Sequence, residues 1–375
     1  MPMRFRATCR RYWLAGAFLL VALATCSCDQ ARKPTSGRTS TIKFAQLTDP
    51  HLFDAGKPSK KQTRTEAEKE SAETLEAFEW ALKQLNEPEN RGLDFVVITG
   101  DFGLEMVSIS LRKKSAEYLA EELTKLNTVH TILLVSGNND LLDESHEYIG
   151  VYNEFVDEVR SHLIAMGKNK TIVNLIKASH APPTLGLVVV GLDSSTFRNK
   201  ECGATVTQPP KPQCPALWDY QTEEMKRVQK ELTKGEDLPA IVFTHIPNLY
   251  DPYEFDGGRM VQSWALHHDT WKVWDEGIAK IPRAVFAGHF HSQNMQDYGQ
   301  PRHLIPSAHP PGRSAPIKKP EFVVCPPLAP KFQLNEQIPK SQGYLIGDID
   351  TKSRIIDYRI IYKNGHHSSG QVELH

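Results

Sequence analysis

Five short segments of this 375-residue chain combine carboxylate, amide and imidazole side chains, and each one follows an apolar run. Oxygen and imidazole ligands without thiolates suit zinc, manganese or iron in an open catalytic site better than a closed structural zinc site. The order of the five segments therefore predicts a hydrolytic metal centre. In chain order, the candidate ligands are Asp49, His51, Asp101, Asn138, His245, His289 and His291.

The spacing within these segments gives each residue a role. Asp49 and His51 are two residues apart, so that both side chains can reach one ion. Asp101 follows a glycine at a strand end, where a carboxylate can approach two ions and bridge them. His289 and His291 alternate off one strand. Each pair alone is a weak signal, because such pairs are common in chains of this length, and the specificity comes from their order.

This order, D-x-H, GD, GN, a lone H and GHxH, resembles the calcineurin-like metallophosphoesterase superfamily over about residues 42–295. The closing segment near 343–362 is also similar to the family's last strands. The resemblance implies an α/β fold, a four-layered αββα sandwich of mixed sheets with a dinuclear metal site at the strand ends. It implies two divalent or trivalent ions drawn from iron, manganese and zinc. One ion would be held by Asp49, His51, Asp101 and His291, and the other by the bridging Asp101 with Asn138, His245 and His289.

Two positions depart from the family pattern. Leu104 stands where a second aspartate is frequent, but that aspartate is not a ligand. Asn139 stands where the family usually has a histidine that contacts the phosphoryl group. An amide can donate a hydrogen bond to a phosphoryl oxygen, but it cannot deliver a proton at neutral pH. We therefore expect Asn139 and Asp101 to be the catalytic residues, without a general acid at position 139.

The expected reaction is hydrolysis of a phosphomonoester or phosphodiester by a metal-bridging hydroxide. The Asn139 variant is similar to some polyphosphatase and sphingomyelinase-like branches, which leaves a polyphosphatase or phosphodiesterase of that kind as one alternative. The other alternative is a surface lipoprotein that only binds a partner. The formal net charge of −1, without a basic run that carries aromatics, indicates no nucleic-acid groove.

Alternation of strand-like and helix-like segments predicts an α/β domain over 42–363. It contains a Pro-rich insertion at about 300–342 with one or two short strands, and a flexible tail at 364–375 follows it. Loops 54–64 and 196–216 follow strands, and Asp193 is expected to be a loop or cap residue. We expect strands at 42–47, 93–99, 131–136, 185–192, 240–244, 284–287, 343–349 and 354–362, and helices at 65–85, 110–126, 145–166, 219–233 and 266–278.

The N-terminus has the pattern of an export signal. Four arginines in the first eleven residues precede the apolar stretch 13–25, which is short for a bilayer span. We expect a signal peptide at 1–28 and a polar tether at 29–41. Lipidation of Cys26 or Cys28 would give a periplasmic or cell-envelope lipoprotein with a membrane tether. Plain secretion, a twin-arginine signal and an uncleaved anchor helix remain open.

Three cysteines lie beyond the signal segment. Cys202 and Cys214 flank a Pro-rich loop and are a candidate disulfide, which leaves Cys325 without a partner. The fold therefore does not depend on a disulfide framework.

Overall fold

A seven-stranded mixed sheet carries the first three candidate segments. The computed structural model describes residues 41–53, 64–104, 107, 109–140, 149–180, 186–194, 223–224, 226–232, 238–246, 284–289, 303–304, 321–329 and 342–374. All belong to one compact unit that runs from Ser40 to His375. The strand order is β12-β11-β10-β1-β2-β3-β4, with β1 to β4 parallel and β10 to β12 antiparallel. The strands are β1 (Thr41–Thr48), β2 (Phe95–Thr99), β3 (Thr131–Val135), β4 (Thr171–Asn174), β10 (Gly343–Asp350), β11 (Ile355–Tyr362) and β12 (His367–Glu373).

A second, five-stranded sheet carries the other two candidate segments. Its order is β5-β6-β7-β9-β8, with only β8 antiparallel to its neighbour. Its central strands are continuous apolar runs, as expected for strands that are covered on both faces. The strands are β5 (Val188–Leu192), β6 (Ala240–Thr244), β7 (Ala284–Ala287), β8 (His303–Leu304) and β9 (Glu321–Val324).

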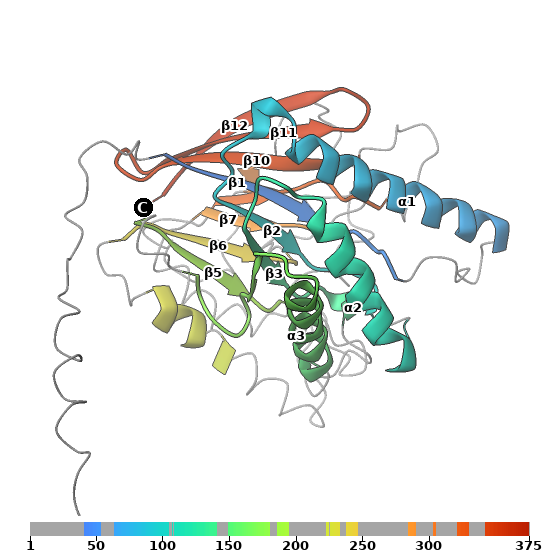
Figure 1. Cartoon of the computed structure of the whole chain (residues 1–375). Coiled ribbons are helices and arrows are strands. Elements are labelled where there is room, and N and C mark those ends of the chain that lie inside the picture. Colours follow the sequence, from blue (N-terminus) through green and yellow to red (C-terminus); the bar gives the residue numbers. More distant parts are fainter. Residues whose placement is uncertain are drawn as a thin grey trace, which may run out of the picture. The chain divides into compact units, whose positions relative to one another are not determined.

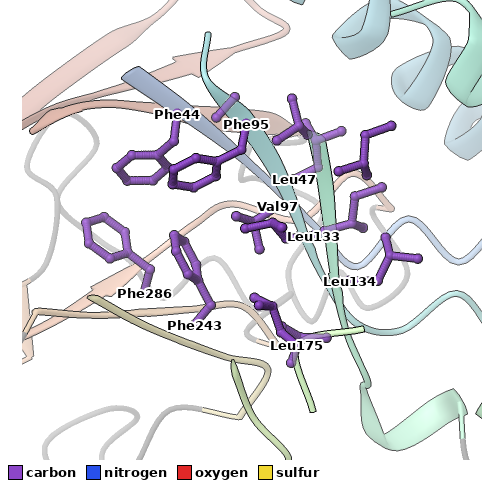
Figure 2. Close-up of a cluster of buried hydrophobic side chains, with 14 of the residues drawn as sticks. Phe44, Leu47, Phe95, Val97, Leu133, Leu134, Leu175, Phe243 and Phe286 are labelled. Atoms are coloured by element: carbon purple, nitrogen blue, oxygen red, sulfur yellow. The ribbon is translucent and has the colours of Figure 1, made fainter. Parts of the chain in front are cut away.

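Aromatic packing joins the two sheets. Phe44 of β1 stacks on Phe95 of β2 with ring centroids 5.6 Å apart. Its edge meets Phe243 of β6 at 5.5 Å and Phe286 of β7 at 5.3 Å. Figure 2 shows these four rings gathered between the sheets, beside Val97 and Leu133. Each such pair adds about 0.5–1.5 kcal/mol beyond its buried area, so this cluster helps to hold one sheet against the other.

Three long helices accompany the seven-stranded sheet (Figure 1). They are α1 (Arg64–Leu85), α2 (Ile109–Thr124) and α3 (Ile149–Ala165), and two short 3-10 turns follow at η1 (Pro88–Asn90) and η3 (Asn138–Asp140). Helical spacing of buried residues explains α1, which buries Phe78, Ala81 and Leu85. Residues 226–232 form a further helical segment next to β5. The expected α/β fold with two mixed sheets and helices is confirmed.

Two expectations about elements need correction. The flexible tail expected at 364–375 is wrong for its described residues, because β12 pairs with β11 along seven positions and Leu374 is buried. The pattern hid this strand because only Ser368 and Val372 within it are buried. Strand β4 was not expected either. The Pro-rich insertion contributes the short strands β8 and β9.

Some expectations lie outside the described residues, namely the helix at 266–278 and the Cys202–Cys214 pair. Cys325 is buried with a free thiol. Among the described residues, no helix has the length and apolar character that a bilayer span requires.

Candidate metal centre

Five candidate ligands meet where strands of both sheets end. Asp49 follows β1, Asp101 follows β2, His245 follows β6 and His289 follows β7. The chain segments stay paired beyond the strands, since Asp49 N donates to Gly100 O at 3.2 Å and His51 N donates to Asp101 O at 2.8 Å. The parallel arrangement thus brings residues up to 240 positions apart to one place.

Glycines allow these segments to approach one another closely. A Cβ on Gly137 would lie 2.2 Å from both the backbone nitrogen and Oδ1 of Asp101. A Cβ on Gly288 would lie 1.8 Å from Thr48 Oγ1 and 2.8 Å from Asp49 Oδ2. No other residue type fits at these two positions without moving a candidate ligand.

Four of the candidate ligands have a left-handed backbone. The φ angles are 51° for Asp49, 41° for His51, 57° for Asp101 and 73° for His289. Among the described non-glycine residues, only Arg354 in a turn shares this conformation. Such conformations cost about 1–3 kcal/mol each and collect at functional sites. The backbone is therefore strained at the residues that the sequence singled out.

The Asp49 carboxylate is oriented by two hydrogen bonds to the same oxygen. Oδ2 accepts from Thr48 Oγ1 at 2.6 Å and from the backbone nitrogen of His289 at 2.9 Å. The other oxygen, Oδ1, lies 3.8 Å from His245 Nε2. With Oδ2 held by these two hydrogen bonds, Oδ1 points into the cluster of ligand atoms.

Asp101 occupies the centre of the cluster. Its Oδ1 accepts from the backbone nitrogen of Asn139 at 2.8 Å. Its Oδ2 lies 3.6 Å from His51 Nε2 and 3.2 Å from His245 Nε2. Two groups that could hold an ion share this carboxylate: Asp49, His51 and Asp101 form one, and Asp101, His245 and His289 form the other. Asp101 is thus the carboxylate that both groups share.

The two imidazoles of the second group converge. His245 Nδ1 donates to the carbonyl of Thr99 at 2.7 Å, which leaves Nε2 as the nitrogen that faces the cluster. His289 Nδ1 lies 3.2 Å from that Nε2. Ligands at about 2.0–2.1 Å from one metal are separated from each other by about 3 Å, so this distance fits two nitrogens on a shared ion.

Burial and neighbouring charges shift the pKa values of the side chains in the cluster. Asp49, His51, Asp101, His245 and His289 are each at most 3% exposed. Burial alone would raise the pKa of Asp101, but the neighbouring His245, His51 and His289 hold it well below its ordinary range. Burial would lower the pKa of His245, but Asp101 and Asp49 raise it to about 10. A proton on His245 therefore balances the carboxylates in the metal-free protein, and a bound ion would replace it.

Asn138 provides an independent test of whether the cluster fits a cation. Its Oδ1 is buried and has no hydrogen-bond partner among the described residues. A buried amide oxygen without a partner carries a desolvation penalty of about 1–3 kcal/mol. An ion at this oxygen would remove the penalty, so the residues present fit a metal.

The residues after Asn138 support Asp101 and its loop. Asn139 Nδ2 donates to Asp101 Oδ2 at 3.0 Å, and its Oδ1 accepts from Asn138 Nδ2 at 2.9 Å. Asp140 accepts from the backbone nitrogens of Phe102 at 2.7 Å and Gly137 at 2.8 Å. Burial, with the Asp101 charge, raises the pKa of Asp140 to about 7. The sequence-based expectations gave Asp140 no role. What could have indicated one is its position as an acidic residue at the end of the short segment that carries Asn138.

The structure thus brings together six of the seven candidate ligands, including Asn138, and His291 lies outside the described residues. Asp140 and Thr48 belong to the candidate segments, but the sequence assigned no role to the Asp140 carboxylate or to the supporting hydroxyl of Thr48. Thr48 had a signal, because a hydroxyl residue directly before the first ligand at a strand end can cap its carboxylate.

The fold and the two groups of carboxylates and imidazoles fit a metal-dependent phosphoester hydrolase. A model of the family described as calcineurin-like phosphoesterase matches residues 42–293, well over half of the chain. The chain belongs to the calcineurin-like phosphoesterase family, and the resemblance seen in its motifs is confirmed. A comparison with curated proteins gave no match.

Proposed function

We propose that the protein is an exported phosphoesterase with two metal ions, which hydrolyses phosphomonoester or phosphodiester bonds. The observation that carries this proposal is the pair of ligand groups that share Asp101. A carboxylate common to two buried groups is the arrangement that a dinuclear hydrolytic site needs.

The residues divide between the two ions. Asp49, His51 and Asp101 would hold the first ion, with His291 as its expected fourth ligand. Asp101, Asn138, His245 and His289 would hold the second. Nitrogen and oxygen ligands favour iron, manganese or zinc. When bound, two ions lower the pKa of a water and offset the charge of the phosphoryl oxygens.

Asn139 would select the leaving group. Its amide lies beside Asp101, where Nδ2 can donate to a non-bridging phosphoryl oxygen and stabilise charge there. The amide has no proton to give to a departing oxygen. We therefore propose substrates whose leaving group needs little protonation, such as phosphate chains or diesters with a stabilised alkoxide, in line with a polyphosphatase or sphingomyelinase-like phosphodiesterase.

Metal content and hydrolysis test the function together. We expect the purified protein to contain bound metal by elemental analysis, and to hydrolyse bis(p-nitrophenyl) phosphate or p-nitrophenyl phosphate after addition of manganese, zinc or iron. Asp101→Ala should abolish both properties. The matched control is Asp357→Ala, which removes an exposed carboxylate on β11 and should leave both unchanged.

Two outcomes would contradict the proposal. A protein that binds no metal, and stays inactive with each added ion, is not a phosphoesterase of this kind. An Asp101→Ala variant that keeps full activity would place the chemistry elsewhere. If the protein were a lipoprotein that only binds a partner, partner binding would persist in Asp101→Ala.

Export is supported by the arginines and the apolar stretch at the N-terminus. We expect the protein in the cell-envelope fraction and, if lipidated, labelling with a fatty-acid probe that Cys26→Ala or Cys28→Ala removes. Recovery of the full-length chain from the cytosol would contradict export.

A further inference from the structure

Strand β5 carries no candidate ligand, yet two fully buried polar residues follow it. These are Asp193 and Ser194, both with no exposed surface. The sequence predicted a loop or cap residue at Asp193, and the structure places it directly after the end of β5 and fully buried. Buried polar groups of this kind are retained where they hold something in place, so their contacts indicate what they do.

Ser194 holds the segment that contains His245. Its Oγ accepts from the backbone nitrogen of Ile246 at 2.7 Å and from Thr244 Oγ1 at 2.8 Å. These two donors flank His245 on either side. On the other edge, Gly288 N donates to His245 O at 3.0 Å. The backbone of His245 is therefore fixed from two neighbouring strands.

Asp193 holds the segment that contains Asn138. Its Oδ1 accepts from Ser136 Oγ at 2.8 Å. Ser136 directly follows β3 and is separated from Asn138 by one glycine. Because β3 and β5 belong to different sheets, this buried bond also links the two sheets beneath the cluster.

A buried ion pair fixes Asp193 itself. Asp193 N donates to Glu224 Oε1 at 2.9 Å, and Arg227 donates to both oxygens of Glu224 at 2.8 and 2.7 Å. Arg227 Nη2 also donates to Gly191 O at 2.5 Å. The Glu224 side chain is 5% exposed. The Arg227 side chain is 22% exposed, and removing it would leave the buried Glu224 carboxylate unpaired, which is costly.

We propose that Asp193 and Ser194 are positioning residues that align Asn138 and His245 for the second ion. This inference rests on the proposed function, because it assigns those two ligands to one ion. The first ion's ligands Asp49 and His51 are held differently, by backbone bonds to the segment after β2. Loss of the contacts made by Asp193 and Ser194 should therefore lower the affinity for the second ion and leave the affinity for the first ion unchanged.

The test compares two serine-to-alanine substitutions with a matched control. Ser194→Ala removes the acceptor of Ile246 N, and Ser136→Ala removes the donor to Asp193. The control is Asn174→Ala at the end of β4, where Oδ1 also accepts a backbone hydrogen bond, from Ile176 at 3.2 Å, in a segment without a candidate ligand. Manganese, zinc or iron is titrated into each metal-free variant, and both binding constants are measured by equilibrium dialysis with elemental analysis.

We expect Ser194→Ala and Ser136→Ala to lower the affinity for the second ion by about 10–100-fold and to leave the first within about twofold. At subsaturating metal, kcat should fall while KM changes little, and excess metal should restore kcat. Asp193→Asn keeps an oxygen that accepts from Ser136, so it should bind the second ion more tightly than Asp193→Ala.

The outcomes separate this inference from the function on which it rests. Wild-type affinities for both ions in Ser194→Ala and Ser136→Ala would overturn the positioning role. So would equal losses at both ions, or a loss no larger than in Asn174→Ala, since these indicate general destabilisation. Failure of the wild type to bind two ions would overturn the proposed function itself. Circular dichroism identifies a variant that does not fold. If one of the two serine variants is unfolded, the metal affinities of the other one decide whether the positioning role holds.

Discussion

Replacement of Gly288 by alanine tests the close approach of the two sheets at the cluster. Gly288 links β7 to His289, and a Cβ there would lie 1.8 Å from Thr48 Oγ1. Thr48 Oγ1 donates to Asp49 Oδ2 at 2.6 Å and lies 2.9 Å from the carbonyl of Thr99. The new methyl group therefore enters the position of the hydroxyl that orients Asp49.

The distances give the size of the effect. An ordinary contact between these atoms begins at 3.4 Å, so Thr48 Oγ1 has to recede from its distance of 1.8 Å by about 1.6 Å. The hydroxyl has a single proton, so that movement removes one donated hydrogen bond, and a bond to a carboxylate contributes about 1.5–3 kcal/mol. We expect Gly288→Ala to lower the free energy of unfolding by about 3 kcal/mol. A displacement of Asp49 by about 1 Å should reduce kcat by about 100-fold.

Urea denaturation, metal analysis and hydrolysis of bis(p-nitrophenyl) phosphate measure these effects. Gly150→Ala in α3 is the control, because a Cβ there meets nothing within 4 Å and should stabilise the protein by about 0.4–1 kcal/mol. In the double variant with Thr48→Ala, the two losses should not add, since both remove the same hydroxyl contacts. A Gly288→Ala protein with wild-type stability and activity would refute the reasoning.

Three further predictions concern the site and the core. Asn139→His should leave metal content unchanged and raise kcat on esters with poor leaving groups; equal rates on a poor-leaving-group series would count against its role. In the metal-free protein, the raised pKa of His245 gives stability that is complete below its ordinary pKa of 6.5 and is lost as pH rises through about 10. Melting temperatures of chelator-treated protein should therefore fall between pH 6.5 and 10, and a flat profile would contradict this. Gly347→Ala should destabilise by about 1–3 kcal/mol with unchanged metal content, because its Cβ would lie 2.2 Å from Phe44; unchanged urea midpoints would argue against that packing.

The strands that the sequence revealed are those whose burial is continuous. β2, β3 and β6 are apolar apart from one terminal threonine each, and their bounds agree with the expectation within about two residues. β12 and β4 were not predicted from the sequence. Both are edge strands, so they do not form continuous buried apolar runs. In β12, backbone pairing with β11 outweighs a polar composition that has no apolar periodicity.

The site shows a similar division. Its ligands could be expected because each combines a reactive side chain with a strand end. The network behind them could not, because Asp193 looks like any polar residue after a strand until Ser136 is brought to it from another sheet. Glu224 and Arg227 had the spacing of an ordinary surface ion pair, and only tertiary packing makes that pair a buried support.

The topology also sets when this protein can complete its fold during synthesis. β1 is the first of the described strands to be made, yet it pairs with β10, one of the last of them. The hydrogen bond from His289 N to Asp49 can form only after 240 further residues have been made. Synthesis of that length takes on the order of tens of seconds at ribosomal speed. Until then the apolar edge of β1 is open and prone to pair wrongly. Asp49 therefore gains its full set of hydrogen bonds, and the cluster gains His289, only after this later part of the chain has been made.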